Sequence, residues 1–302
     1  MKPLVIVNPQ AGHGKAGRNW KVWQRRLTNA VGTFEVVFTQ HGGHAETLTR
    51  QAIREGYRHI HAVGGDGTLN EVVAGFFQGD QPLCSETLLS IWPAGTGCDF
   101  HRGLLHPTIR SQPGTDQVTS IDVGHLSFMD HQQRPADRYF LNIASCGVSG
   151  LVDQLIDRKW KSLGGRLGFF VNTVEALFRY KNRRVRIRTN HGDLGERLVR
   201  LVAIANGKYF GGGMKIAPDA QIDDGSFQLV IVGDVGILEV LAATPRLYAG
   251  THLSHPKIEA QNVTWVELTS DEEVLLDLDG EALGTLPLRA RVIPAAIRLK
   301  TY

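Results

Sequence analysis

The sequence predicts a two-domain protein, with an N-terminal doubly wound α/β domain and a C-terminal β-rich sandwich domain. Through the first hundred residues, short β-branched runs alternate with segments whose apolar residues recur at helical spacing, which indicates βαβ units around a parallel sheet. After about residue 120, strand-like runs separated by Gly, Asp and Pro turns dominate. The length of 302 residues also exceeds the usual size of one hydrophobic core. We expect domains at residues 1–122 and 123–289, with the segment from about 290 to 302 returning to the first.

In the N-terminal domain, each expected strand ends at a loop on the way to the next helix. The expected strands are Leu4–Val7, Glu35–Phe38, His59–Val63 and Leu88–Trp92. Helices are expected around residues 20–30, 45–53 and 69–77, where apolar residues lie three or four positions apart. Because an open α/β sheet binds ligands at the carboxyl ends of its strands, we expect a site where these loops follow the strands.

The C-terminal domain is expected to be mainly β-structure with one inserted helix. The expected strands are Arg184–Arg188, Leu198–Ala205, Phe227–Val232, Val263–Leu268, Val274–Leu278 and Arg289–Ile293. The helix is expected around Phe170, Val174 and Leu177, which lie at positions i, i+4 and i+7.

Composition and charge exclude several classes of protein. The 33 Lys and Arg against 30 Asp and Glu leave a net charge of +3, too small to require nucleic acid as a partner. No apolar run reaches the length of a transmembrane segment, and the N-terminal run of four apolar residues is too short for a secretory signal. Cys84, Cys98 and Cys146 lack C-x-x-C spacing, which argues against disulfides and structural zinc. We therefore expect a cytoplasmic location in a reducing compartment.

Positive charge is concentrated between Arg158 and Arg200. This segment contains twelve Lys and Arg against three acids, a net charge of 12 − 3 = +9. Two interpretations remain open: attraction to the anionic headgroups of a membrane surface, or a solvated face that keeps the protein soluble.

The most informative loop is Gly64-Gly-Asp-Gly-Thr68, at the junction of an expected strand and an expected helix. Glycines there permit positive φ and let backbone N–H groups approach an anion. Thr68 and Glu71 have the spacing of a capping box, which predicts a helix N-terminus behind the loop that favours a phosphate. Asp66 would repel a phosphate unless it addresses a bound Mg²⁺ or a nearby hydroxyl. The alternative is a tight βα turn with a helix cap.

Two further loops follow expected strands, Asn8–Gly12 and Pro93–Asp99. In a parallel sheet, all three loops lie at one edge and can line one site, so the sequence predicts that they bind a nucleoside triphosphate. A P-loop is excluded because the stretch that begins at Gly12 lacks the G-K-[ST] ending, and the dinucleotide fingerprint is absent after the first strand.

Asp277, Asp279 and Glu281 lie at positions i, i+2 and i+4 after an apolar run. On a strand they would project from one face. One interpretation is a metal-binding and general-base face that points into a cleft between the domains; the other is a solvated edge strand. Phosphoryl transfer needs a carboxylate that receives the hydroxyl proton. We assign that role to Asp279, with Asp66 orienting magnesium-bound phosphates and also a rival for the role of base.

These motifs together resemble the diacylglycerol kinase catalytic-domain family, which includes bacterial lipid kinases, sphingosine kinases and ceramide kinases. The N-terminal motifs are Gly64–Thr68 followed by L-N-E-V, Asn8-Pro-x-Ala-Gly12 and Pro93-x-Gly-Thr-Gly97. The C-terminal motifs are Asn206-Gly, Gly211–Gly213, Ala217–Ala220, Asp223–Gly225 and Leu278–Glu281. They span nearly the whole chain and resemble the soluble bacterial type in particular. Cys98 stands where the family usually has Asn.

The resemblance implies a fold shared with NAD kinases, an N-terminal ATP-binding domain and a C-terminal lipid-substrate domain. It implies ATP-binding residues at Asn8, Pro9, Gln10, Ala11, Gly12, Thr39, Gly64, Gly65, Asp66, Gly67, Thr68, Leu69, Asn70 and Thr96. It also implies a Mg²⁺ site at Asp219 with backbone oxygens of Ile216 and Gln221, and Asp279 as the proton acceptor.

The activity implied is transfer of the γ-phosphate of ATP to a hydroxyl of a diacylglycerol-like or sphingoid lipid at a membrane surface, in lipid metabolism and phospholipid biosynthesis. The alternatives are a NAD kinase-like enzyme and a non-catalytic protein that senses a nucleotide or lipid. The sequence leaves the oligomeric state open, with a homodimer among the options.

Overall fold

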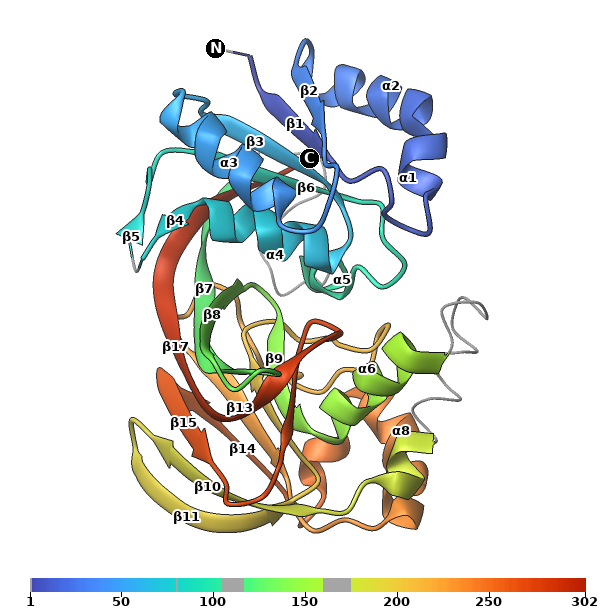
Figure 1. Ribbon diagram of the computed structural model, residues 1–302, viewed down its shortest axis with the longest axis vertical. Coiled ribbons are helices and arrows are strands. Elements are labelled where there is room, and N and C mark those ends of the chain that lie inside the picture. Colours follow the sequence, from blue (N-terminus) through green and yellow to red (C-terminus); the bar gives the residue numbers. More distant parts are fainter. Residues whose placement is uncertain (1, 80, 105–116, 160–174) are drawn as a thin grey trace. The chain divides into compact units, whose positions relative to one another are not determined.

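The computed structural model describes residues 2–79, 81–104, 117–159 and 175–302 (Figure 1). The chain divides into two compact units, unit 1 of residues 1–123 and 294–302 and unit 2 of residues 124–293. The part of the expected helix around Phe170 and Val174 lies outside the described residues.

Unit 1 contains a parallel sheet with helices on both faces. Its strands are β1 (Leu4–Val7), β2 (Glu35–Phe38), β3 (His59–Gly64) and β6 (Leu88–Pro93), in the order β2-β1-β3-β6. All neighbouring pairs among these four strands are parallel. The last part of β17 (Glu281–Thr301) pairs in parallel with β6 through Arg298 and Leu299, and thereby extends the sheet. The carboxyl ends of these strands therefore lie at one edge, as the alternating sequence pattern predicts.

The helices of unit 1 cover both faces of this sheet. They are α1 (Lys15–Arg18), α2 (Trp20–Val31), α3 (His44–Arg54), α4 (Asp66–Gly75) and α5 (Asp99–Leu104), and a short hairpin of β4 (Phe77–Gln78) and β5 (Gln81–Pro82) follows α4. Leu27 of α2 packs with Val5, Val7 and Val63 on one face. Ala62, whose side chain points to the opposite face, lines a pocket together with Leu69 of α4. Because successive strand residues alternate between the two faces, the strands of this sheet read as nearly continuous apolar runs.

Unit 2 is built mainly from antiparallel strands. Its elements are β7 (Gln117–Asp130), β8 (Pro135–Phe140), β9 (Ile143–Gly147), α6 (Val148–Lys159), β10 (Arg183–Thr189), β11 (Gly192–Val199), β12 (Leu201–Ala205), β13 (Phe227–Val232), α8 (Ile237–Ala249), the 3₁₀ turn η1 (His252–Ser254), β14 (Ile258–Val263), β15 (Trp265–Thr269), β16 (Leu275–Leu278) and the first part of β17. One run of neighbours is β14-β13-β12-β9-β16-β17, while β10 pairs with β11 and β15, and β15 also pairs with β17. Strands β7 and β17 contribute residues to both units.

Strand β12 shows how unit 2 forms its core. Val202 and Ile204 join a large cluster that also contains side chains of β10, β13 and β15. Leu201 and Ala203 point the other way, into a second cluster beneath the segment around Ala217. The strand is therefore buried on both faces: one face packs inside the sandwich, and the other is covered by the segment around Ala217. The expected strand Leu198–Ala205 is divided at Arg200, because β11 ends at Val199 and β12 begins at Leu201. The buried side chain of Arg200 donates hydrogen bonds to the backbone carbonyls of Val235 and Leu177.

Candidate functional site

Three loops meet at the carboxyl edge of the sheet in unit 1. The Asn8 side chain, directly after β1, donates from Nδ2 to Oγ1 of Thr68 at 2.8 Å, and its Oδ1 accepts from the backbone N–H of Gln10 at 2.9 Å. The backbone N–H of Ala94, after β6, donates to the carbonyl of Gly64 at 2.8 Å. These bonds join the loops after β1, β3 and β6, which the sequence placed together on topological grounds.

Two glycines allow these loops to approach closely. Gly12 has φ +60°, and a Cβ atom there would lie 2.6 Å from the carbonyl oxygen of Ala94. A Cβ atom on Gly95 would lie 2.5 Å from the Cα of Gly65, which is a backbone atom that cannot swing away. The edge of the site is therefore bare main chain, which is the surface that a phosphate needs in order to accept backbone N–H groups.

Helix α4 begins two residues before the predicted N-cap. Its first helical residue is Asp66, and the preceding Gly65 is extended with φ −99°. Thr68 therefore lies inside the first turn, where its hydroxyl oxygen accepts from Asn8. Glu71 accepts from the backbone N–H of Ala45 at the start of α3, 3.1 Å away, instead of returning to its own helix. The predicted capping box is wrong, but a helix N-terminus does stand directly behind the glycine loop, with first-turn N–H groups that lack intrahelical partners.

The carboxylate of Asp66 caps a second helix. Its Oδ2 accepts from the backbone N–H of Asp99 at 3.2 Å, and its Oδ1 accepts from that of Phe100 at 3.4 Å. Both donors belong to the first turn of α5, so the carboxylate lies at the N-terminus of that helix. Burial raises the pKa of Asp66, an effect that these backbone hydrogen bonds oppose. A carboxylate with a raised pKa accepts a proton more readily near neutral pH than an ordinary one.

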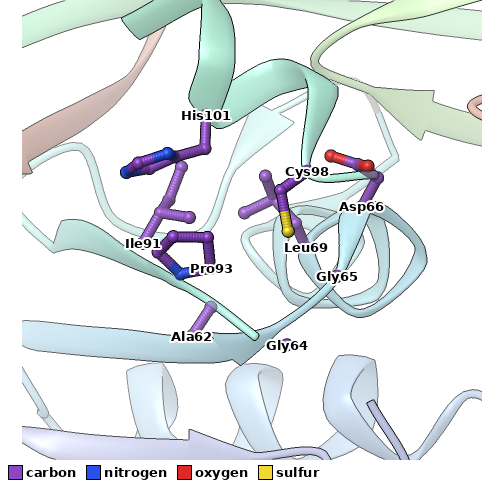
Figure 2. A pocket seen from close by; sticks show the side chains of 9 residues that line it. All are labelled: Ala62, Gly64, Gly65, Asp66, Leu69, Ile91, Pro93, Cys98 and His101. Carbon is purple, nitrogen blue, oxygen red and sulfur yellow. The ribbon is translucent and has the colours of Figure 1, made fainter. Parts of the chain in front are cut away.

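A small pocket lies beside Asp66 (Figure 2). It is lined by Ala62, Gly64, Gly65, Asp66, Leu69, Ile91, Pro93, Cys98 and His101. Burial raises the pKa of Cys98 to about 11, so its thiol is protonated at neutral pH and is not a nucleophile. Burial also lowers the pKa of His101, which favours a neutral imidazole. Asp66 is the one carboxyl group among these lining residues.

His101 is a lining residue that the sequence analysis missed. It lies three positions after Cys98, and α5 begins between them. Cys98 has φ 50° and lies outside the helix, so helical spacing gave no signal that would place His101 beside the thiol.

The remaining expected nucleotide residues lie near these loops. Thr39 follows β2, and its backbone N–H donates to the carbonyl of Val7 at 2.9 Å, next to the end of β1. Pro9 accepts from the backbone N–H of Gly17 at 3.1 Å, and Ala11 is buried. Leu69 and Asn70 lie in α4, and Thr96 belongs to the loop after β6. The expected set is thus carried by the ends of four neighbouring strands and the start of one helix.

In unit 2, Asp279 occupies a tight hairpin turn between β16 and β17. Asp279 has φ 51° and Gly280 has φ 87°, and Leu278 pairs with Glu281 across the turn. Positive φ at both central residues characterises a type I′ turn, for which Asp-Gly is a favoured pair. The Oδ1 atom of Asp279 accepts from the backbone N–H of Ile143 at 2.8 Å, and the backbone N–H of Asp279 donates to the carbonyl of the same residue at 3.1 Å.

The expected acidic face is therefore wrong, because the chain reverses after Leu278. Asp277 is buried in β16, where its Oδ1 accepts from the backbone N–H of Gly280 at 2.8 Å and its Oδ2 accepts from the Ser145 hydroxyl at 2.7 Å. Its carboxylate braces the turn from inside, while Asp279 lies in the turn itself and Glu281 begins the next strand. Side chains at positions i, i+2 and i+4 share one face only if all of them belong to one continuous strand, and β16 ends at Leu278.

The expected Mg²⁺ ligands lie in a turn between β12 and β13. The carbonyl of Ile216 accepts from Nε2 of the buried His252 at 3.0 Å. Gln228 donates to Oδ2 of Asp219 at 3.3 Å and accepts from its backbone N–H at 3.1 Å. These contacts hold a carboxylate and a carbonyl in place, and oxygen atoms of this kind fit Mg²⁺ because a carbonyl or carboxylate retains further lone pairs. The described residues contain no cluster of three His, Cys, Asp or Glu that could hold a metal ion.

The alternating arginines of β10 are paired with acids. The ion pairs are Arg183–Glu272 at 2.7 Å, Arg184–Glu196 at 3.1 Å, Arg186–Asp193 at 2.6 Å and Arg188–Glu267 at 3.7 Å. Glu267 and Glu272 lie outside the basic segment 158–200, so the net charge of that segment alone overstates the positive charge around β10. For β10, the structure favours the solvated-face interpretation over attraction to a membrane. No helix among the described residues is long and apolar enough to span a bilayer.

Comparison with protein families matches both parts of the chain. Residues 2–132 match the diacylglycerol kinase catalytic domain, and residues 142–301 match the YegS C-terminal NAD kinase β-sandwich-like domain. The predicted fold class is thereby confirmed. The predicted boundaries of the domains and the roles of individual residues stay predictions.

Individual proteins that resemble this chain include diacylglycerol kinases. The diacylglycerol kinase of Staphylococcus saprophyticus is 32% identical over 289 residues, which cover 94% of this chain and 90% of the relative. A crystal structure of a diacylglycerol kinase from Bacillus anthracis has a TM-score of 0.69 at 22% identity and covers 100% of this chain and 97% of that one. Yeast NADH kinase complexed with NADH has a TM-score of 0.53 at 11% identity and covers 100% and 84%, a likeness of fold alone.

Proposed function

Because this chain belongs to the diacylglycerol kinase family, we propose that it is an ATP-dependent lipid kinase. It transfers the γ-phosphate of ATP to a hydroxyl of a diacylglycerol-like or sphingoid lipid. The observation that carries the proposal is the convergence of three bare loops on the N-terminus of α4, in a chain that is 32% identical over 94% of its length to a diacylglycerol kinase.

The nucleotide is held by unit 1. Backbone N–H groups of the loop at Gly64–Thr68 and of the first turn of α4 donate to phosphate oxygens, and the helix dipole adds attraction for their negative charge. The Asn8–Thr68 hydrogen bond keeps the loops after β1 and β3 at a fixed spacing. Because these donors are main-chain atoms already fixed by the fold, little reorganisation accompanies binding.

Mg²⁺ would be held by oxygens of Ile216, Asp219 and Gln221. When bound, the ion supplies neutralisation of phosphate charge. Gln228 holds the carboxylate of Asp219, and His252 holds the carbonyl of Ile216, so both groups are fixed within the turn between β12 and β13.

The proton of the acceptor hydroxyl passes to a carboxylate, and Asp279 is our candidate. The Ile143 N–H holds its Oδ1 atom and thereby orients the carboxylate, while the type I′ turn fixes its backbone. Asp66 is the rival, because its raised pKa suits a base and it lies beside the expected phosphate loop.

The test is an acceptor panel with labelled ATP and Mg²⁺, in which diacylglycerol, sphingosine and NAD are offered separately and each product is identified. We expect a phosphorylated lipid. Phosphorylated NAD alone would instead establish the NAD kinase alternative, and ATP binding without transfer to any acceptor would support the sensor alternative.

Two isosteric variants separate the candidate bases. Asp279→Asn keeps an oxygen for the Ile143 N–H and tolerates positive φ, so it removes charge with little change in the turn. We expect kcat to fall at least about 100-fold with ATP affinity unchanged. If Asp66→Asn abolishes transfer while Asp279→Asn retains it, the base is Asp66.

A further inference from the structure

Helix α8 presents an apolar face to solvent. Its most exposed large side chains are Leu238 at 82%, Leu241 at 43% and Tyr248 at 53%, and none of its residues is buried. Residues 238, 241, 245 and 248 follow one another at spacings of three and four, so they share one side of the helix, and Pro245 on that side is exposed as well. A surface helix ordinarily turns its polar side outward, so this arrangement indicates a partner.

A second exposed apolar side chain, Phe178 at 66%, is tied to the beginning of α8. The buried Arg200 donates from Nη2 to the carbonyl of Leu177 at 3.4 Å and from Nε to the carbonyl of Val235 at 3.2 Å. One guanidinium therefore bridges the residue before Phe178 and the residue three positions before Leu238.

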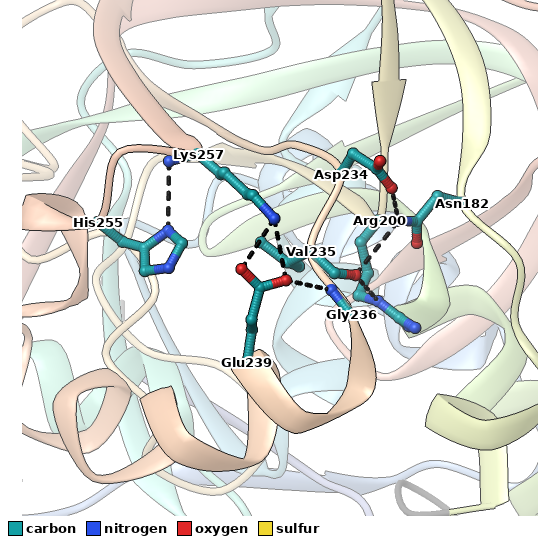
Figure 3. A network of polar contacts seen from close by, with 8 residues as sticks. All are labelled: Asn182, Arg200, Asp234, Val235, Gly236, Glu239, His255 and Lys257. Carbon is teal, nitrogen blue, oxygen red and sulfur yellow. Dashed lines mark hydrogen bonds and ion pairs between the residues drawn. The ribbon is translucent and has the colours of Figure 1, made fainter.

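The same junction is braced by a second side chain, as Figure 3 shows. Asn182 donates from Nδ2 to Oδ1 of Asp234 at 2.7 Å and to the carbonyl of Val235 at 3.2 Å. These bonds hold the two apolar segments in fixed positions, so ordering them on a partner costs little extra conformational entropy.

The charges around this surface favour an anionic partner. The carboxylate of Glu239 accepts hydrogen bonds from Lys257 at 2.8 Å and from the backbone N–H of Gly236 at 2.7 Å (Figure 3). Asp234 is engaged by Asn182. The charged side chain among the exposed residues of α8 is the cationic Arg246, and Lys181 is exposed near Phe178. Leucine and aromatic side chains bordered by cations are typical of helices that lie in a lipid interface.

We propose that Phe178, Leu238, Leu241 and Tyr248 form a lipid-docking surface, which enters the headgroup region of an anionic bilayer while Arg246 contacts lipid phosphates. The choice of a bilayer over a second protein chain rests on this charge pattern and on the proposed function, which requires an acceptor that resides in a membrane. Tyr248 suits the position because its ring is apolar and its hydroxyl can remain in the wet headgroup layer. The arginines of β10, already paired with acids, take no part.

The test is sedimentation of the full chain with vesicles of phosphatidylglycerol and phosphatidylcholine, compared with vesicles of phosphatidylcholine alone. The variant is Leu238→Asp with Leu241→Asp, at exposed positions where folding is tolerant. The matched control is Val22→Asp, an apolar side chain 51% exposed on α2 of unit 1. We expect the double variant to lose at least about tenfold in affinity for anionic vesicles, since each leucine forfeits its burial and adds a repelled charge. The control should bind like the wild type.

Two outcomes overturn this inference. One is unchanged vesicle binding by the double variant. The other is a wild-type dimer that the double variant converts to a monomer with vesicle binding retained, which would assign the surface to a second copy of the chain.

Turnover separates this inference from the proposed function. With a short-chain, water-soluble diacylglycerol, the double variant should match the wild type, whereas with vesicle-borne substrate its kcat/KM should fall. If the wild type phosphorylates no lipid in either form, the proposed function fails, while vesicle binding still decides the role of the surface.

Discussion

Replacing Gly95 by alanine tests whether the close approach of two loops creates the nucleotide site. The added Cβ atom would lie 2.5 Å from the Cα of Gly65 and 3.3 Å from the Cys98 sulfur. Ordinary contact begins at 3.4 Å, so the loop after β6 must move by 3.4 − 2.5 = 0.9 Å away from the loop after β3. Gly95 does not have positive φ, so the effect is steric and not conformational.

A displacement of 0.9 Å is large compared with the tolerance of a hydrogen bond. The N–H of Ala94 donates to Gly64 at 2.8 Å, and that bond does not survive the move. If the two loops together present at least one charge-assisted bond to phosphate, its loss costs about 1.5–3 kcal/mol. We therefore expect the Kd for ATP to rise about 10- to 100-fold. Overpacking should also lower the free energy of unfolding by about 1–3 kcal/mol.

Glycines of the same region provide a graded control series. Gly65→Ala meets the Cα of Gly95 at 3.2 Å, a small overlap, and Gly103→Ala in α5 meets nothing within 4 Å. Gly103→Ala should keep ATP affinity and stabilise the helix by about 0.5–1 kcal/mol. ATP affinity is measured by calorimetry and stability by thermal unfolding. If Gly95→Ala remains folded and binds ATP within twofold of the wild type, the close contact of the loops does not create the site.

Three further changes have outcomes that the structure determines. Cys98 has φ 50°, which Asn adopts more readily, so Cys98→Asn should raise stability in thermal unfolding by about 0.5–1 kcal/mol; an unchanged midpoint would show that the backbone there is not strained. Burial lowers the pKa of His61 to about 3 from 6.5, so its contribution to stability is complete above pH 6.5 and is lost as the pH falls toward 3. Urea unfolding at pH 5 should therefore show about 2 kcal/mol less stability from this group than at pH 7.5, and His61→Gln, which can still accept from the Trp92 indole, should remove that difference. Asp277→Ala leaves the Gly280 N–H without its acceptor and should lower stability by about 3 kcal/mol in urea unfolding, whereas Asp277→Asn should cost clearly less; equal losses would contradict a bracing role for the carboxylate.

Local sequence determined much of the fold of unit 1. The β-branched run at Leu4–Val7 forms β1 over those same residues, and the runs at Glu35–Phe38 and Leu88–Trp92 also form the expected strands. For β1 the prediction succeeds because a strand buried on both faces needs an apolar residue at each position, and that requirement is visible without knowledge of its neighbours. The strand β2 is mostly exposed, and the β-branched pair Val36 and Val37 is what identified it. The convergence of the glycine loops followed from topology in the same way.

Local spacing failed where a distant residue competed for the same group. Thr68 and Glu71 have the spacing of a capping box, but their partners are Asn8 and Ala45, both from other elements. The partners of Asp66 in the first turn of α5 are likewise more than thirty positions away along the chain. A spacing rule covers one helical turn, so it cannot anticipate a hydrogen bond supplied by another part of the fold.

The sequence by itself determined the order of strands and helices, the bare loops at the sheet edge and the family to which the chain belongs, because period, turn chemistry and motif are properties of consecutive residues. Tertiary structure alone decided that Asp277 braces a turn, that Asp279 sits in it, that the β10 arginines are neutralised and that α8 exposes its leucines. Each of these depends on which side chains meet across the fold, and the burial and charge of a residue are set by neighbours that sequence distance does not reveal.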